Sequence, residues 1–284
     1  MNFIKSPLNY IGGKYKILEQ IYEVLPEEVD TFVDLFAGGF NVGINSNAKK
    51  IICNDQITYL IDLFQYLAQN NINDIISNIN KIINEFSLSQ QNTEGYNLLR
   101  NRYNETKDIK DFFVLIFFSF NHQIRFNSKL KFNVSFGKNR SSYNATIEKK
   151  LIRFCDALQN KNIEFFNKDF LEVDLYNLGN NDLVYCDPPY LISTAPYNDG
   201  KNGFKNWTQK EEEQLLNLLD NLNSKGIRFA LSNVLYHKGC SNDLLIDWSK
   251  KYNINYIDKT YKYCNYQFKE KDAKTVEVVI TNFS

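Results

Sequence analysis

Short apolar runs alternate with longer amphipathic stretches along this chain, and the two patterns predict different elements. Apolar runs of about four to eight residues, rich in Ile, Val and Phe and bounded by Asn, Asp, Gly or Pro, are typical of buried strands. Such runs lie within residues 31–36, 48–56, 163–170, 182–192, 227–234 and 275–283. Apolar residues at helical spacing occur within residues 9–18, 58–70, 72–86, 145–160 and 208–226, and Thr208 is placed to cap the last of these helices.

The order of these elements predicts an α/β fold. A strand at residues 31–36 leads through a glycine turn into an expected helix, and the next strand ends at an acid, Asp55. This is the order of one half of a doubly wound nucleotide-binding sheet. Residues from about 60 to 120 show no clear strand, and residues 110–121 form an apolar run that fits either a buried helix or a strand. We therefore expect a sheet domain that is interrupted by a mostly helical insertion.

Composition narrows the possible classes of protein but does not indicate a function. The 284 residues include 33 basic and 33 acidic side chains, so the net charge gives no sign of a nucleic-acid partner. The chain has no apolar run of about 18 residues, which predicts no membrane span, and its first residues lack the apolar core of a signal peptide, which favours the cytoplasm. Five scattered cysteines without a CxxC pair favour reduced thiols over disulfides or a metal site.

The distribution of charge says more than its sum. Residues 125–153 carry eight basic side chains against one acid, Glu148. The basic residues are Arg125, Lys129, Lys131, Lys138, Arg140, Lys149, Lys150 and Arg153. Aromatic residues and Asn alternate with them, so this segment is either a surface that contacts nucleic-acid phosphates or an ordinary solvated face.

A glycine motif follows the strand at residues 31–36. In "DLFAGGFNVG", residues 34–43, Gly38 and Gly39 would let the backbone approach a ligand, and the expected helix would present its N–H donors there. Asp55, at the end of the next strand, is placed to accept both hydroxyls of a ribose. The spacing differs from the G-x-G-x-x-G of dinucleotide sites, and a purely structural turn is the alternative.

A second glycine motif lies near the start of the chain. In "NYIGGKYKIL", residues 9–18, a Gly-Gly pair and Lys14 precede an amphipathic stretch. A lysine in this position can hold a carboxylate or a phosphate, and an ordinary surface lysine is the alternative.

The acid in "LVYCDPPYLI", residues 183–192, comes where an apolar strand ends. Two prolines then fix the backbone in an extended form. An exocyclic amine conjugated to an aromatic ring is a poor nucleophile because its lone pair is delocalised. Asp187 and the carbonyl of Pro188 could accept the two N–H bonds of such an amine and free its lone pair, while Tyr190 offers a face for stacking. A strand end closed by a simple loop is the alternative.

Together and in this order, "NYIGGKY", "FVDLFAGGFNVG" and "DPPY" resemble the DNA N6-adenine methyltransferases of the alpha arrangement, the group that includes GATC-methylating enzymes. The similarity also takes in "FNHQIRFNSKLKFNVSFGK", "GIRFALSNV" and "TVEVVITNF", and so covers nearly the whole chain. It implies a Rossmann-like, S-adenosylmethionine-dependent methyltransferase sheet with a mostly helical DNA-recognition insertion. Residues 1–57 and 146–284 would form the catalytic domain, and residues 58–145 a target-recognition domain with a basic hairpin.

The resemblance further implies a role for single residues of the cofactor site. Tyr10 would pack on the adenine of S-adenosylmethionine, Lys14 would lie near its methionine carboxylate, and Asp55 would bind its ribose. Asp169 and Phe170 would bracket the adenine. The implied cofactor-binding set is Tyr10, Lys14, Asp34, Phe36, Gly38, Asp55, Asp169, Phe170 and Asp187, and the implied catalytic set is Asp187, Pro188, Pro189 and Tyr190.

The segment "NHQIRFN" fits the family's N-x-x-x-R-x-N hairpin pattern. Arg125 would read a base, and residues near Phe120 and Asn121 would fill the gap that a displaced base leaves. The implied DNA-binding set is Phe120, Asn121, Arg125, Asn127, Lys129, Lys138 and Arg140. Ser135 stands where the family commonly has Pro, which leaves the recognised DNA sequence open.

The implied reaction moves a methyl group from S-adenosylmethionine to N6 of an adenine that has left the stack of double-stranded DNA. The resemblance fits a methylase paired with a cognate restriction endonuclease and a solitary methylase equally well. Two other functions are a DNA-binding regulator that keeps the fold and a different Rossmann enzyme such as a dehydrogenase. The complete motif at residues 187–190 argues against the first, and the missing G-x-G-x-x-G argues against the second.

Overall fold

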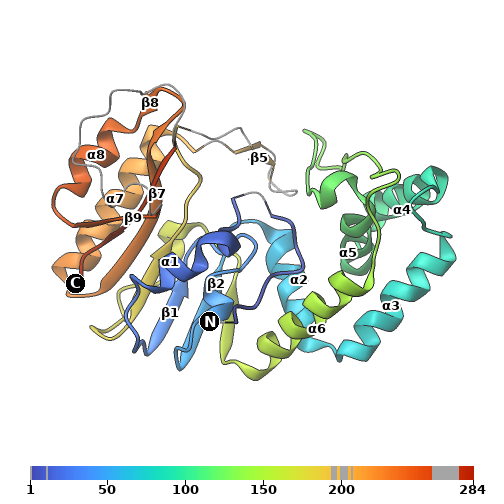
Figure 1. The fold of residues 1–284 in the computed structure, drawn as a ribbon, viewed down its shortest axis with the longest axis horizontal. Helices are drawn as coiled ribbons and strands as arrows, with labels where there is room; N and C mark the ends of the chain where they lie inside the picture. Colours follow the sequence, from blue (N-terminus) through green and yellow to red (C-terminus); the bar gives the residue numbers. More distant parts are fainter. Residues whose placement is uncertain (1, 11, 193–196, 199–203, 206, 258–274) are drawn as a thin grey trace.

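A single mostly parallel sheet forms the centre of the molecule (Figure 1). The computed structural model describes residues 2–10, 12–192, 197–198, 204–205, 207–257 and 275–284. The strands lie in the order β3 (Ile163–Phe166), β2 (Lys50–Asn54), β1 (Thr31–Asp34), β4 (Leu183–Cys186), β7 (Arg228–His237), β10 (Val276–Thr281) and β9 (Asn253–Tyr256). β3, β2, β1, β4 and β7 are parallel, whereas β10 is antiparallel to β7 and to β9. The short strand β8 (Cys240–Ser241) pairs with the end of β7, and β5 (Tyr197–Asn198) pairs with β6 (Phe204–Lys205).

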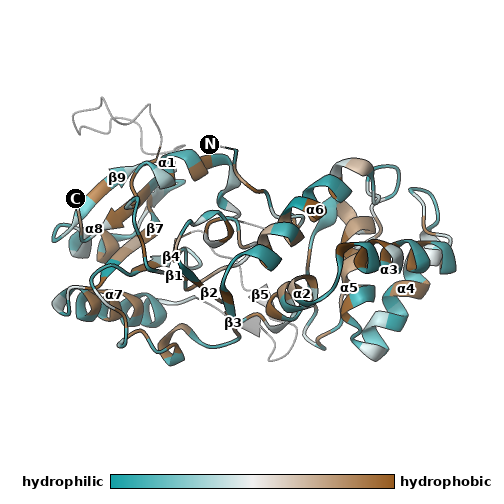
Figure 2. Cartoon of the chain, turned by 90° about the horizontal axis from the view of Figure 1, so that it is seen from below, coloured by the Kyte–Doolittle hydropathy of each residue, from teal (hydrophilic) through white to brown (hydrophobic). Residues whose placement is uncertain are grey.

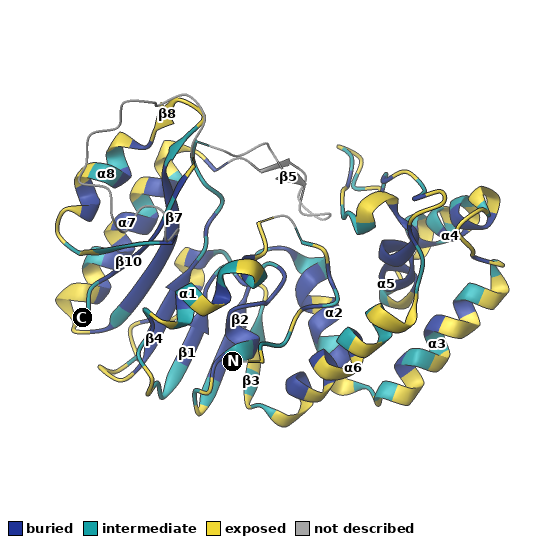
Figure 3. Cartoon of the chain, viewed as in Figure 1, coloured by how far each residue is buried: buried dark blue, intermediate teal, exposed yellow. Residues whose placement is uncertain are grey.

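Both faces of this sheet are buried, which explains why its strands read as nearly continuous apolar runs. Alternate residues of a strand belong to different hydrophobic clusters. In β4, Leu183 and Tyr185 pack into one cluster, while Val184 and Cys186 pack into the other. The helices α7 (Gln209–Ser224) and α8 (Asp243–Ser249) cover the second face, and α1 (Leu18–Tyr22), α2 (Thr58–Gln69) and α6 (Ala145–Asn160) contribute to the cluster on the first (Figures 1 and 3).

The helical insertion has no core separate from the sheet. It contains α3 (Ile72–Glu85), α4 (Thr93–Thr106) and α5 (Ile109–Phe118), the last of which is almost entirely hydrophobic (Figure 2). Their buried side chains belong to the same cluster as Phe32 of β1 and Ile51 of β2. The division into residues 58–145 and the remainder therefore runs through continuous packing, and it stays a prediction.

A buried ion pair fixes α4 against α5. Asp111, almost fully buried, accepts hydrogen bonds from Nε of Arg102 at 2.7 Å and from its Nη2 at 2.6 Å. The same guanidinium reaches Glu85 at the end of α3. Because a buried carboxylate is costly without a partner, this two-bonded geometry holds the three helices in one arrangement.

The predicted α/β class and the predicted strands are confirmed, and residues 110–121 resolve as helix α5 followed by a helical turn, η3 (Phe120–His122). Thr208 caps α7 in a capping box with Glu211, as predicted. The helix expected after the glycine turn is wrong, because only a single 3-10 turn, η2 (Gly43–Asn45), forms there. Helix α4, helix α8 and strand β9 were not predicted, since none of them has a strong apolar period in its sequence.

The strand order reverses between β1 and β4, which places a crevice at their carboxyl ends. β1 leads to β2 and β3 on one side, and β4 leads to β7 on the other. The glycine motif after β1 and the Asp187 motif after β4 both begin at this crevice.

Gly43→Ala should lower the free energy of unfolding by about 1–3 kcal/mol, because overpacking a closed site strains its neighbours. A Cβ on Gly43 would lie 2.5 Å from the ring of Phe40 and 2.9 Å from Oδ2 of Asp34. Urea unfolding measures the loss. Gly179→Ala is the matched control, since its Cβ would meet only Asp182 at 3.8 Å. Equal stabilities for the two variants would contradict this packing.

Candidate functional site

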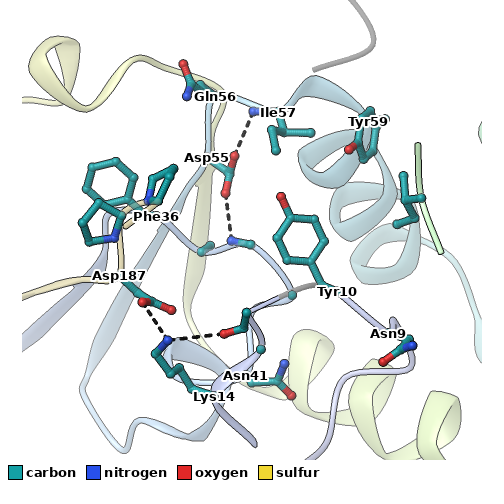
Figure 4. Close-up of a pocket in the computed structure, with 18 of the residues that line it drawn as sticks. Asn9, Tyr10, Lys14, Phe36, Asn41, Asp55, Gln56, Ile57, Tyr59 and Asp187 are labelled. Atoms are coloured by element: carbon teal, nitrogen blue, oxygen red, sulfur yellow. Dashed lines mark hydrogen bonds and ion pairs between the residues drawn. The ribbon is translucent and has the colours of Figure 1, made fainter. Parts of the chain in front are cut away.

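A cavity of about 930 Å³ opens at the crevice between β1 and β4 (Figure 4). Its walls come from residues 9–10 and 12–14, from the loops after β1, β2 and β4, and from residues 123–128 and 133 of the insertion. Seven of the nine predicted cofactor-binding residues line it, as do all four predicted catalytic residues and two of the predicted DNA-binding residues, Arg125 and Asn127. Segments that are far apart in the sequence thus meet at one cavity.

Lys14 is a buried side chain of the cavity wall with several polar partners. It lies in η1 (Lys14–Ile17), and only 6% of its side chain is exposed, so the alternative of a surface lysine is wrong. Its Nζ lies 2.9 Å from Oδ1 of Asp187 and 3.3 Å from Oε1 of Glu277, and it also bonds the hydroxyl of Tyr190 and the carbonyl of Gly12. Burial alone would lower the pKa of Lys14, but the two carboxylates raise it above its usual value, so the ammonium stays charged.

Asp187 lies in this ion-pair cluster rather than on an exposed loop. Its side chain is 19% exposed, and its Oδ1 accepts hydrogen bonds from Lys14 and, at 3.0 Å, from the hydroxyl of Tyr190. Burial raises the pKa of Asp187, while Lys14 counteracts that shift. In the part of the chain that the structure describes, Oδ2 has no hydrogen-bond partner, which leaves one acceptor for an amine.

Two buried acids hold the loops after β1 and β2. Oδ2 of Asp34 accepts from the main-chain N–H of Gly43 at 2.9 Å, and burial raises the pKa of Asp34 to about 7. Asp55 accepts from the N–H of Gly38 at 2.8 Å and from that of Ile57 at 2.9 Å, and burial raises its pKa to about 6. Each Asp55 oxygen can accept a second bond, so both can also face a pair of hydroxyls.

Tyr10 closes the site over the glycine turn. Atoms of its ring lie 3.1 and 3.2 Å from where a Cβ on Gly38 would stand, and its own Cβ lies 3.1 Å from the same position on Gly39. Gly38 has φ +50°, a conformation that glycine adopts without strain. The two glycines therefore allow the close approach of Tyr10, whereas the predicted approach of a ligand to this turn stays a prediction.

Asp169 and Phe170 are the two predicted cofactor-binding residues that do not line the cavity. Asp169 caps the short turn η4 (Phe170–Glu172) by accepting from the N–H of Leu171. Phe170 is buried, with its ring centroid 5.3 Å from that of Phe36 and 5.7 Å from that of Trp207. Phe170 contacts Phe36 of the cavity wall without lining the cavity itself, so the adenine-bracketing role of Asp169 and Phe170 stays a prediction.

The predicted basic hairpin is built from two isolated antiparallel bridges, Ser119–Phe136 and Phe126–Phe132. Arg125 is exposed, and its Nε donates to Oδ1 of Asn133 at 3.2 Å. Asn127 holds the tip of the hairpin instead of pointing a free amide outward, because its Oδ1 accepts the N–H groups of Lys129 and Lys131.

The other predicted DNA-binding residues lie near the base of the hairpin or on its exposed side. The guanidinium of Arg140 sits 4.8 Å from the centroid of the exposed ring of Phe120. Asn121 has φ 53°, and its carbonyl accepts from Nδ2 of Asn9 at 2.9 Å, which ties the hairpin to the segment beside Tyr10. Lys129 and Lys138 are exposed.

Glu277 was missed by the motif-based prediction. It is a single acid in the apolar strand β10, and its Oε1 contacts both Lys14 and Tyr190. A lone charge inside an otherwise apolar central strand was the available signal, because such a charge needs a partner.

Metal and membrane features are absent from the described residues. Within those residues, no cluster of three or more His, Cys, Asp or Glu side chains is arranged to hold a metal ion. None of the helices placed by the structure has the length and apolar character to cross a bilayer. Cys53, Cys155, Cys186 and Cys240 are free thiols, and Cys264 lies outside the described residues.

Comparison with known proteins agrees with the family resemblance that the sequence motifs indicate. The family model for D12 class N6 adenine-specific DNA methyltransferases matches residues 10–263. The chain is 48% identical over 283 residues to the type II methyltransferase M.FokI of Planomicrobium okeanokoites, covering 100% of this chain and 43% of that protein. It is 46% identical over 283 residues to the modification methylase StsI of Streptococcus sanguinis, covering 99% and 43%. A DNA adenine methylase of Salmonella typhi is 26% identical over 230 residues, covering 80% and 79%. The chain thus spans less than half the length of M.FokI and StsI.

Asp34→Asn should flatten the pH dependence of stability. Asp34 has a folded-state pKa of about 7 against an ordinary 3.8, so its contribution is full below about pH 4 and is lost as pH rises through 7. Asparagine cannot ionise and keeps an oxygen for Gly43. From pH 5 to 8, the wild type should therefore lose on the order of 2 kcal/mol of its free energy of unfolding relative to the variant.

Denaturant unfolding across this pH range measures the effect, with the exposed Asp247→Asn as the control. Parallel pH curves for wild type and Asp34→Asn would show that Asp34 is not the ionising group.

Proposed function

Because the chain belongs to the D12 class N6 adenine-specific DNA methyltransferases, we propose that it transfers a methyl group from S-adenosylmethionine to N6 of an adenine in duplex DNA. One observation carries this proposal above the others. The Asp187–Tyr190 motif, the predicted cofactor residues and the hairpin residue Arg125 line the same cavity. A base entering from the DNA side would therefore reach Asp187 beside the methyl donor.

The chemistry of the cavity fits the proposed methyl donor, whose sulfonium makes the methyl group susceptible to attack by a nucleophile. Asp34, Asp55 and Asp187 line the cavity together with the cations Lys14 and Arg125. Carboxylates on the cavity wall favour a ligand that carries a sulfonium and an ammonium group over its neutral-sulfur product. Asp55 would accept the ribose hydroxyls, Tyr10 would pack on the adenine, and Lys14 would face the carboxylate.

The catalytic role of the chain would rest on hydrogen-bond acceptors. Oδ2 of Asp187 and the carbonyl of Pro188 would take the two N–H bonds of the target amine and localise its lone pair on nitrogen. The two prolines hold these acceptors apart when no substrate is bound. Tyr190 would stack on the displaced adenine.

DNA recognition would use the hairpin and its surroundings. Arg125 is exposed at the cavity rim and suits a guanine, whose O6 and N7 accept a pair of N–H bonds. Phe120 and Asn121 would fill the space of the displaced base, and Lys129, Lys138 and Arg140 would contact phosphates. Displacing the base costs about a few kcal/mol, which these contacts would offset.

The biological setting follows from the relatives. M.FokI and StsI carry the names type II methyltransferase and modification methylase, which favours a restriction-modification role with a cognate endonuclease over a solitary one. Such a protein would act in the cytoplasm, where bacterial DNA lies.

Asp187→Ala should reduce methyl transfer at least tenfold, a loss of about 1.4 kcal/mol or more of transition-state stabilisation. Transfer of tritiated methyl groups from S-adenosylmethionine to DNA measures it. Lys14 keeps Glu277 as a partner, so the variant should fold. Asp247→Ala, a change in an exposed ion pair, is the control. A variant that retained more than a tenth of the rate would remove Asp187 from the mechanism, and label appearing in RNA or protein instead of DNA would overturn the proposed substrate.

Arg125→Ala and Lys138→Ala should affect DNA binding in different ways. The arginine variant should lose about 1–3 kcal/mol of discrimination at one base pair, with little change in salt dependence. The lysine variant should bind all sequences more weakly and flatten the slope against log salt by about one unit. Binding to single-base variants of the methylated site at two salt concentrations tests both. If Arg125→Ala weakened all sequences alike, Arg125 would be a phosphate contact.

A further inference from the structure

Glu277 gives the Asp187 cluster a second carboxylate that is open to solvent. It lies on β10, and 28% of its side chain is exposed, compared with 19% for Asp187 and 6% for Lys14. Oε1 of Glu277 lies 3.2 Å from the hydroxyl of Tyr190, which in turn lies 3.0 Å from Oδ1 of Asp187. Asp187, the Tyr190 hydroxyl and Glu277 thus form a short chain that leads from the cavity to solvent.

The proposed reaction requires an acceptor for one proton. As N6 bonds to the methyl carbon, the carbon–sulfur bond breaks and its electron pair neutralises the sulfonium. The nitrogen then carries the positive charge until it loses one of its two protons. Lys14 cannot take this proton, because Asp187 and Glu277 keep it in the ammonium form. Asp187 can take it first, but a proton left there would occupy an acceptor that the next adenine needs.

We propose that Glu277 receives this proton through the hydroxyl of Tyr190. This inference rests on the proposed function. The N6 proton moves to Oδ2 of Asp187, and a turn of the carboxyl group brings this proton to the Tyr190 oxygen. As Tyr190 takes it, Tyr190 releases its own hydroxyl proton to Oε1 of Glu277. Every bond broken in this relay is matched by one formed, and Glu277 then releases the proton to water. The relay restores ionised Asp187 and neutral Tyr190 for another turnover.

Within the described part of the chain, few groups near Glu277 could replace it as a proton acceptor. The segments packed against β10 bring Lys14, Asp187 and Tyr190 to face Glu277. The buried Tyr185 interacts electrostatically with Glu277. Burial raises the pKa of both tyrosines, so each keeps its hydroxyl proton at rest. On the neighbouring strand β7, the residue paired with Glu277 is Val234, which does not titrate.

Glu277→Gln separates proton acceptance from positioning. Glutamine keeps an oxygen for Lys14 and Tyr190 but cannot take a proton at neutral pH. If Glu277 only positioned Lys14, Glu277→Gln would leave the rate unchanged or would weaken cofactor binding. The relay predicts a slower chemical step with unchanged affinity for S-adenosylmethionine and DNA. The loss of rate should shrink as pH rises, because solvent hydroxide then takes the proton in place of Glu277.

The experiment measures single-turnover methyl transfer to DNA from pH 6 to 9, at saturating S-adenosylmethionine, together with the dissociation constants of cofactor and DNA. We expect Glu277→Gln to be about tenfold slower near pH 7, since general bases typically contribute at least this much, and to approach wild type at high pH. Tyr190→Phe keeps the stacking ring and should show a similar loss. The double variant should be no slower than the slower single variant, because both changes interrupt one relay.

Glu164→Gln, at an exposed ion pair on β3, is the matched control and should equal wild type. The relay is overturned if Glu277→Gln stays within about twofold of wild type at every pH, if its loss follows cofactor affinity alone, or if the two single losses multiply in the double variant. The proposed function fails separately, as an absence of methyl transfer to DNA by the wild-type protein.

Discussion

The buried ammonium of Lys14 is the contact on which the rest of the site depends. It joins the segment before α1 to the loop after β4 and to β10, three parts of the chain that are far apart in the sequence. An ammonium that is 6% exposed needs carboxylates beside it, and the lysine in turn counteracts the rise in the pKa of Asp187 that burial causes. The same mutual dependence places Asp187 and Tyr190 at fixed positions beside the cavity.

Main-chain N–H groups, rather than a cation, stabilise the other two buried acids of the site, Asp34 and Asp55. Among the residues that the structure describes, no lysine or arginine pairs with Asp34 or Asp55, and these acids accept the N–H groups of Gly43, Gly38 and Ile57 instead. Burial raises the pKa values of these acids, and the partial dipoles of the N–H groups offset that rise less than a full cation would. The loops after β1 and β2 are thereby shaped before any ligand arrives, at a cost in stability that grows with pH.

Much of this arrangement could be predicted from the sequence, because the strands and the residues that follow them are local patterns. The apolar runs gave the strands, and the positions of Asp55 and Asp187 at strand ends placed both acids at one crevice. Contacts that depend on distant strands could not be predicted in this way. Glu277 joins Lys14 only because β10 inserts between β7 and β9, and Asn127 turns inward only because the hairpin tip needs its oxygen. The false helix after Gly39 arose because glycines suit a helix start and a tight turn equally.

If the insertion reads DNA as proposed, the core that it shares with the sheet limits how new sequence specificity can be engineered. Tyr59 of α2 packs its ring 4.8 Å from that of Phe126 in the hairpin and 5.2 Å from that of Phe112 in α5, while other residues of α2 pack into the cluster that covers the sheet. A graft of the hairpin alone from a relative would bring side chains that are adapted to pack on a different α2. Exchange of recognition parts between such enzymes therefore calls for transplanting α2 through α6 as one piece, together with the side chains that face them on the sheet.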